Sequence, residues 1–473
     1  MNKPSKVALS VIALLSSSSV FADNLLEVYN IAKDNDPTYL ASDAGRKATN
    51  ERVNQSMAAL LPQISATISA SKTSRESSGT TTVVGSVDDP NTPDVDESAP
   101  QNSANESDST SSGFSVRLSQ EIYNHSSWLS LRQSEKRALQ SNVNHEGAKQ
   151  DLIIRVAEAY FNVLAAMDSV EFSKAETEAV SKELAQTKQR FEVGLIAMTD
   201  VHEAQSRHDR ALANQISAQN GLDNAHEALQ QVTGQYHYDL LGLKNEIPLR
   251  NPQPTDIKSW VKEAETNNVS IKASRIGLDI AKKSIDISFA GHLPTLDLSA
   301  SYTDGSGDTD SQGTQFFGSL GITSNTTSDG DSTDSSVSLN LNIPIYSGGR
   351  TNAQVKEAQA LYQQAAHNLE ADHRRAVSET RSAYLGVVAA VSSVNALNQA
   401  VVSSQSALEA TQAGFEVGTR TIVDVLLQTQ QLYSAKRDHA RARYDYILNT
   451  LRLKRSAGLL TEDDLSQVNK LLR

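Results

Sequence analysis

The 473-residue sequence has no cysteine, so it can form no disulfide bond and can carry no lipoprotein anchor. Aromatic residues make up 5% of the chain and the whole hydrophobic set 38%, which is little for a large core. The formal net charge of -13 argues against nucleic acid as a partner. After the N-terminus we find no run of about 20 apolar residues, so we predict no membrane-spanning helix. These shortages favour an elongated, mostly exposed helical protein.

The first 22 residues have the pattern of a secretory signal peptide. Lys3 and Lys6 form a basic start, and residues 7–15 are almost entirely apolar. Val20-Phe21-Ala22 is a plausible cleavage site before Asp23. The apolar run is too short to cross a bilayer. We therefore predict an exported protein whose mature chain begins at Asp23.

The rest of the chain is a tandem duplication. Phe-Glu-Val-Gly occurs at 191–194 and again at 415–418, and Asp-Val follows at the same spacing in both places. Across residues 191–201, 6 of 11 positions are identical to those 224 residues downstream. The sequence therefore predicts two repeats, 23–250 and 251–473, with one architecture built twice.

Two long helices joined by the glycine turn are expected in each repeat. Apolar side chains recur at alternating spacings of three and four residues, which is the coiled-coil period, and the short turn makes each pair antiparallel. The predicted helices cover about 126–191 and 199–233 in the first repeat, and about 350–415 and 420–456 in the second. At about 1.5 Å per residue, the first of them would be roughly 100 Å long.

Four segments alternate between apolar and polar side chains, at about 63–71, 113–123, 295–303 and 336–346. This pattern is typical of membrane β-barrel strands, with a soluble sheet that has one wet face as the alternative. Lipid tolerates no open sheet edge, and single-chain barrels begin at about 8 strands. Four strands per chain therefore require identical copies, and three copies would close a twelve-stranded barrel. The polar segments 72–112 and 303–335 are expected as loops on its outer side.

The sequence lacks the motifs of an enzyme. It has no glycine-rich phosphate loop, no His-Glu-x-x-His and no Gly-x-Ser-x-Gly, so we expect no catalytic residue, no cofactor and no metal site. Asp200 and Asp424 occupy matching positions just after the two turns. Either carboxylate can simply complement the dipole of its helix. If Asp424 faces the axis of a trimer, three carboxylates form a ring that selects cations.

Three longer runs carry a resemblance to a known family: Ala159-Tyr160-Phe161-Asn162-Val163-Leu164, Pro344-Ile345-Tyr346-x-Gly-Gly349, and residues 417–425. Through them the chain resembles the TolC family of outer-membrane efflux channels, from Asp23 to about Asn469. The resemblance implies a mainly α fold with a membrane β part. A trimeric 12-stranded β-barrel, with four strands per chain, would continue into a long α-helical coiled-coil barrel in the periplasm of a Gram-negative bacterium.

The resemblance also implies a function and partners. The homotrimer would lie in outer-membrane lipid and serve as the exit duct of tripartite efflux and type I secretion systems, for drugs, bile salts or proteins. Its partners would be a periplasmic adaptor protein and an inner-membrane pump of the RND, ABC or MFS type, with no nucleic acid. An iris-like gate would close the periplasmic tip.

Carried over by position, the family's gate falls on Thr199, Asp200 and Arg420, with Asp200 and Arg420 in a network that holds the inner helix pair closed. Asp424 matches the ring of aspartates at the pore constriction. The tips expected to contact the adaptor are Val193, Gly194, Leu195, Val417, Gly418 and Thr419.

Three positions depart from the family pattern. Phe415 replaces an expected gate tyrosine and cannot donate a hydroxyl hydrogen bond to Asp200. Glu183 replaces a gate glutamine and adds a second carboxylate that can come within reach of Arg420. Leu427 replaces a second ring aspartate. We hypothesise that closure here relies more on charge pairing with Arg420, and that the single ring binds multivalent cations more weakly.

Two other classes of protein share some of these features. A secreted coiled-coil adhesin or structural protein would use the same helices, but it has no use for lipid-facing strands. A periplasmic adaptor is normally anchored to the inner membrane, and we find no such anchor in this sequence. Resistance to detergent extraction would separate these classes, because only the barrel predicts an integral outer-membrane protein.

Overall fold

The computed structural model describes residues 23–84, 98–317 and 320–473, so the predicted signal peptide lies outside the described residues. The chain divides into a helical unit (up to Ala48, Leu139–Leu278 and Ala365–Arg473) and a sheet unit (Thr49–Ala138 and Asp279–Gln364). The elements are α1 (Leu25–Asn35), α2 (Pro37–Ala58), β1 (Gln63–Val84), β2 (Ser98–Tyr123), α3 (His125–Glu192), α4 (Met198–Thr233), α5 (Ile257–Asn267), α6 (Val269–Ala290), β3 (Thr295–Phe317), β4 (Leu320–Asn342), α7 (Arg350–Glu416), α8 (Ile422–Ser456) and α9 (Glu462–Asn469).

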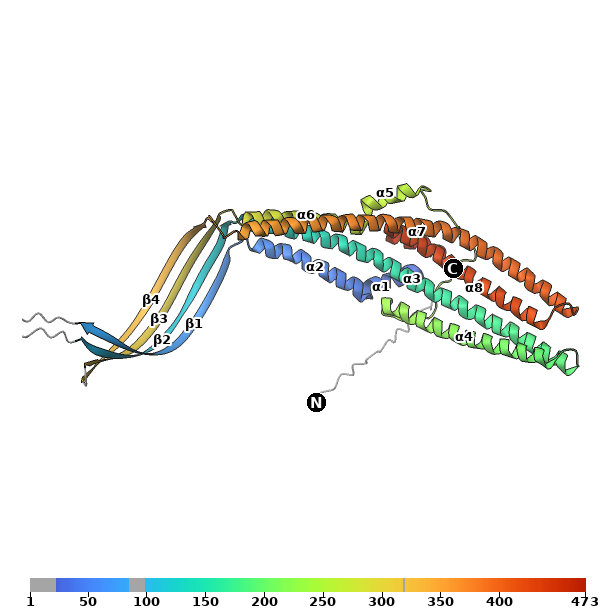
Figure 1. The fold of residues 1–473 in the computed structure, drawn as a ribbon, viewed down its shortest axis with the longest axis horizontal. Coiled ribbons are helices and arrows are strands. Elements are labelled where there is room, and N and C mark those ends of the chain that lie inside the picture. The colour runs from blue at the N-terminus through green and yellow to red at the C-terminus, as the bar shows by residue number, and fades with distance from the viewer. Residues whose placement is uncertain (1–22, 85–97, 318–319) are drawn as a thin grey trace, which may run out of the picture. The chain divides into compact units, whose positions relative to one another are not determined.

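The sheet unit contains one antiparallel sheet in the order β1-β2-β3-β4 (Figure 1). The register places Ile64 opposite Leu118 and Leu298 opposite Leu339, so the apolar side chains of neighbouring strands share one face. β1 and β4 are edge strands, each paired on one side only. Four strands per chain and the duplicated architecture, both predicted from the sequence, are confirmed.

The strands are much longer than predicted, which corrects the assignment of residues 72–84, 98–112, 303–317 and 320–335 as loops. The rest of the two predicted loops, 85–97 and 318–319, lies outside the described residues. β1 has 22 residues, β2 has 26, and β3 and β4 have 23 each. Ladder hydrogen bonds use backbone groups, so pairing continues where the side chains no longer alternate. Hydroxyl pairs add cross-strand contacts, as between Ser71 and Ser111, whose oxygens lie 2.8 Å apart.

The last predicted strand also ends earlier than expected. β4 stops at Asn342, although the alternation of side chains continues to Ile345 and the predicted strand to about residue 346. Pro344 lacks a backbone N–H and cannot donate to a ladder. Within the sheet unit, a hydrogen bond also joins the helices α3 and α6. The Gln133 side chain of α3 donates to the carbonyl of Ile280 in α6 at 3.1 Å.

The helical unit is built around two long antiparallel pairs, α3 with α4 and α7 with α8 (Figure 1). Its main core collects Leu152, Tyr160 and Phe161 of α3, each no more than 1% exposed. The Tyr160 hydroxyl donates to the carbonyl of Leu241 at 2.8 Å, which satisfies its polar end inside the core. The short helices α1 and α9 pack against each other.

After the N-terminus the sequence has no long continuous run of apolar residues, but one long helix is still rich in apolar side chains. Among the described residues, α7 contains an 18-residue stretch that is apolar enough to cross a membrane by length and composition, and 17% of that stretch is buried. The α7 side chains of Leu385 and Val402 are 59% and 52% exposed. Alanine and valine are spread between serine and asparagine in this helix, which is why no continuous apolar run marks it in the sequence.

Candidate gate at the helical turns

The two turns that join the long helices have the same backbone geometry. Gly194 and Gly418 have φ angles of 78° and 80°, in the left-handed region where glycine avoids the clash of a Cβ atom. A glycine in this conformation is the usual end of a helix, because it lets the next amides bond back to the last turn. The repeated glycine therefore sets both turns.

Backbone hydrogen bonds close the two turns in parallel fashion. The N–H of Leu195 donates to the carbonyl of Arg190 at 2.9 Å, and the N–H of Thr419 donates to that of Gly414 at 2.8 Å. The apolar side chains at the two tips face solvent. The exposed ones are Val193 (70%), Leu195 (72%) and Val417 (76%).

The helices that leave the turns begin differently. Thr421 caps α8: the N–H of Asp424 donates to the Thr421 hydroxyl oxygen at 3.3 Å, and the Thr421 N–H donates to the Asp424 carboxylate at 3.0 Å. α4 begins after Ala197, which has no side-chain cap. The reciprocal bond that occupies Asp424 in the second repeat is therefore missing for Asp200 in the first.

Phe415, the predicted aromatic gate position, is buried and lies against an arginine. Phe415 is 8% exposed, and the Cζ atom of Arg190 lies 4.3 Å from the centre of its ring. This is the geometry of a cation–π contact, and it joins the end of α3 to the end of α7. Phe415 also packs with Leu408 and Val425 in a second, smaller core near the turns.

Glu183 is half-buried on α3 and forms a hydrogen bond with Gln412 of α7. Burial raises the pKa of Glu183, partly opposed by a hydrogen bond from Gln412 and by the positive charge of Arg190. Gln412 therefore hydrogen-bonds to this carboxyl group, Arg190 acts on it through its charge, and Arg190 also contacts Phe415. Glu183, Arg190, Gln412 and Phe415 form one cluster between α3 and α7, which we call the α3–α7 latch.

The predicted pair of Asp200 and Arg420 is not joined within this single chain. Among the described residues, no hydrogen bond or ion pair links the two side chains. Arg420 is exposed, and its Cγ lies 2.8 Å from where a Cβ would stand on Gly414. Asp200 and Thr199 lie in the first turn of α4. The network of Asp200 with Arg420 stays a prediction.

Local contacts stabilise the charged form of Asp424. Hydrogen bonds from the Thr421 N–H and hydroxyl lower the pKa of Asp424, and the charge of Arg420 adds to this effect. Leu427, three residues later, is 41% exposed. The carboxylate of Asp424 therefore has a structural role as a helix cap, beside the predicted role in a pore ring.

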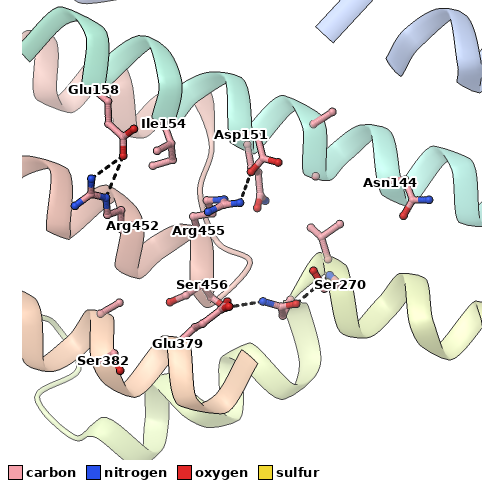
Figure 2. Close-up of a pocket in the computed structure, with 16 residues that line it drawn as sticks. Asn144, Asp151, Ile154, Glu158, Ser270, Glu379, Ser382, Arg452, Arg455 and Ser456 are labelled. Atoms are coloured by element: carbon pink, nitrogen blue, oxygen red, sulfur yellow. Dashed lines mark hydrogen bonds and ion pairs between the residues drawn. The ribbon is translucent and has the colours of Figure 1, made fainter. Parts of the chain in front are cut away.

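A polar cavity of about 560 Å³ lies elsewhere in the helical unit, among α3, α6, α7 and α8 (Figure 2). Its two arginines are already paired: Arg452 with Glu158 at 2.7 Å, and Arg455 with Asp151. Asn268 donates to the carbonyl of Ser456 at 2.8 Å and so joins the start of α6 to the end of α8. We interpret this cavity as part of the junction between these helices.

Long paired helices, a sheet with one apolar face and two exposed glycine turns define the class of outer-membrane channels. The model of the outer membrane efflux protein family matches residues 28–235 and 260–459, one segment in each repeat. The chain therefore belongs to the outer membrane efflux protein family and is an outer-membrane protein.

Individual relatives match nearly the whole chain. The outer membrane protein TolC of Vibrio cholerae is 40% identical, over 97% of this chain and 95% of the relative. TolC of Escherichia coli is 39% identical, over 99% and 88%. The alkaline protease secretion protein AprF of Pseudomonas aeruginosa is 27% identical, over 96% and 88%.

Solved structures share the fold. CusC aligns with a TM-score of 0.70 at 15% identity, over 92% of each chain. The outer membrane protein VceC of Vibrio cholerae aligns with a TM-score of 0.68 at 17% identity, over 92% of this chain and 96% of that one.

Two members of the latch were missed in the sequence. Arg190 lies seven residues after Glu183, and Gln412 lies three residues before Phe415. Both spacings return a side chain to the same helix face. This signal was available, but which faces meet depends on how α3 and α7 pack.

Proposed function

We propose that this protein is the outer-membrane exit duct of tripartite efflux and type I secretion systems. The observation that carries the proposal is the match to the efflux family in both repeats, over nearly the whole chain. The relatives include a protease secretion protein, which favours protein export as well as efflux. The duct itself is passive and has no catalytic activity, so energy comes from an inner-membrane pump.

The duct is a homotrimer, for two physical reasons. β1 and β4 leave long unpaired edges, and hydrocarbon cannot satisfy their backbone groups. Three copies supply twelve strands and remove every edge. The apolar, exposed stretch of α7 gives the helical part a surface that a second copy can cover.

The gate lies at the helical turns. Closure is held by the Asp200–Arg420 network predicted from the family, and by the α3–α7 latch within each chain. Arg420 is exposed and free to reach a neighbouring copy, and the uncapped start of α4 leaves Asp200 available. Opening is an iris-like separation of the helix pairs, triggered when a periplasmic adaptor contacts the exposed tips around Gly194 and Gly418.

Single-channel conductance in a planar bilayer tests this function. Wild-type trimers should give small pores, and Arg420→Ser should enlarge them because it removes one partner of the network. Lys182→Ser is the control for loss of a positive charge, since Lys182 lies on α3 ten residues before its end and pairs with Glu178 on its own helix at 2.8 Å. Pores that are wide in the wild type would refute this account of closure and keep the duct. Well-folded trimers without pores would favour the adhesin.

A second experiment tests the cation ring. Multivalent cations should block the wild-type pore weakly, because Asp424 supplies one carboxylate per chain. Leu427→Asp should tighten the block, with Leu427→Asn as the uncharged control. Equal block in all three proteins would contradict a ring at this depth.

A further inference from the structure

The strand register shows that one face of the sheet is apolar near the helices and acidic farther along the strands. From the end that connects to the helices, this face carries Leu339 beside Leu298 and then Val337 beside Ala300. On β1 and β2, Ile64 faces Leu118. We call this side of the sheet the apolar face.

The apolar part of this face has the height of a bilayer core. Along β3 it runs from Leu296, opposite Tyr123, to the level of Phe114 at residue 304, which is eight residues or about 26 Å at ~3.3 Å per residue. With a strand tilt of about 40° it spans roughly 20 Å, close to the ~25 Å apolar band of outer-membrane barrels. Its far end carries an aromatic pair, Phe114 and Tyr302, with ring centres 5.9 Å apart. Aromatic residues are typical of the membrane–water boundary.

Beyond the aromatic pair the same face becomes acidic. Asp308 lies directly opposite Asp329, and Asp108 lies directly opposite Asp310. The carboxyl side chains on this part of the face are Glu76, Glu106, Asp108, Asp304, Asp308, Asp310, Asp329 and Asp331, and the basic one is Lys72. Like charges placed directly opposite each other destabilise a sheet, and they cannot be desolvated in lipid. This part of the face needs water.

The opposite face carries little of this charge. Along the same stretch it presents hydroxyl groups and glycines, for example Ser109, Thr309 and the facing pair Gly307 and Gly330. A duct lined with carboxylates would put the acids on that side. They lie instead on the side that carries the apolar side chains closer to the helices.

We propose that the outer boundary of the membrane hydrocarbon lies at the Phe114–Tyr302 pair, and that the strands continue beyond it as a solvated collar with an acidic outer surface. The inference rests on the proposed function, because it takes the apolar face as the outside of a trimeric barrel. In this arrangement the barrel contacts lipid acyl chains through the apolar band, which is the part of the apolar face between the helices and the Phe114–Tyr302 pair.

Strand length supports the collar independently. A membrane-spanning β-strand needs about 9–11 residues. The strands here have 22 to 26 residues, so about half or more of each extends beyond what the hydrocarbon requires. Since the strands connect directly to the helices at the apolar end, the excess lies at the hairpin end.

Site-directed spin labelling tests the boundary, and the absence of cysteine allows single labels without background. The variants are Leu339→Cys in the apolar band, Asp310→Cys and Asp108→Cys in the collar, and Ser301→Cys on the opposite face. Trimers are placed in phospholipid vesicles, and collisions are measured with oxygen, which concentrates in lipid, and with a neutral nickel chelate, which stays in water. The ratio of oxygen to nickel collisions should be several-fold higher at 339 than at the other three positions.

The outcomes separate the collar from the duct. An oxygen-rich signal at both 339 and 310 would overturn the collar and leave the barrel intact. A nickel-rich signal at 339 in pore-forming trimers would overturn the apolar band as the lipid contact. If labels at 310 and 108 are both in water while 339 is in lipid, the boundary lies between them as proposed. Asp108→Cys guards against a local change caused by a single substitution.

Discussion

The contact between Arg190 and Phe415 should contribute measurably to closure of the gate. The guanidinium Cζ lies 4.3 Å from the ring centre, and the ring is 8% exposed. A cation–π contact in such a partly desolvated place stabilises by about 1 kcal/mol. If opening separates α3 from α7 in all three chains at once, the three contacts together stabilise the closed trimer by about 3 kcal/mol. A change of about 1.4 kcal/mol in free energy changes an equilibrium constant tenfold. Removing the contact should therefore lower the ratio of closed to open channels on the order of a hundredfold.

A double-mutant cycle isolates this contact from simple loss of packing. Phe415→Leu removes the π face but keeps an apolar side chain, and Arg190→Met removes the charge but keeps most of the stem. The fraction of time in the high-conductance state is measured for the wild type, the two single variants and the double variant. We expect the double variant to open no more than the stronger single variant.

Additive effects of the two substitutions would refute the reasoning. If the free-energy changes add within about 0.3 kcal/mol, the two side chains do not interact in the closed state. Arg420→Ser provides the positive control for opening in the same bilayers. A thermal unfolding scan of each variant checks that the helical unit keeps its fold.

Three further predictions concern the helical unit. Ala197→Ser should supply the missing cap of α4 and stabilise the helix by about 0.5–1 kcal/mol in thermal unfolding. It should also widen the pore, because the Asp200 carboxylate would then bond to the cap and not to Arg420. A narrower pore would contradict the role given to Asp200. Asp36 is 1% exposed and accepts a hydrogen bond from Arg155 at 2.8 Å. Arg155→Ala should lower the free energy of unfolding by about 3 kcal/mol in chemical denaturation, because it leaves this buried carboxylate without its charged partner. A loss below about 1 kcal/mol would show that water replaces the arginine. Burial alone would raise the pKa of Glu462, but hydrogen bonds from Lys33, Lys149 and Tyr29 outweigh it and hold the pKa at about 2. The unfolded carboxyl binds its proton first as pH falls, so this stability is present above about pH 4.5 and is lost towards pH 2, and Glu462→Gln should weaken the pH dependence of unfolding in that window.

Local patterns in the sequence determined the elements and their repetition. The heptad spacing of apolar residues and the two Phe-Glu-Val-Gly turns predict paired long helices, because helix periodicity and the left-handed glycine depend on near neighbours along the chain. The alternation on four segments predicts four strands for the same reason. The resemblance to a family then supplied the positions of Thr199, Asp200, Arg420 and Asp424.

The tertiary structure decided how far pairing extends and which side chains meet. The polar segments after Ser71 and Tyr302 have no side-chain pattern that predicts a strand. Strand pairing there depends on backbone hydrogen bonds to the neighbouring strand, and the local sequence does not show which segment that neighbour is. Glu183, Arg190, Gln412 and Phe415 come together only because α3 packs against α7, more than 200 residues away in the chain. The acidic rows of the collar likewise depend on register, since a shift of one residue would turn every carboxylate to the other face.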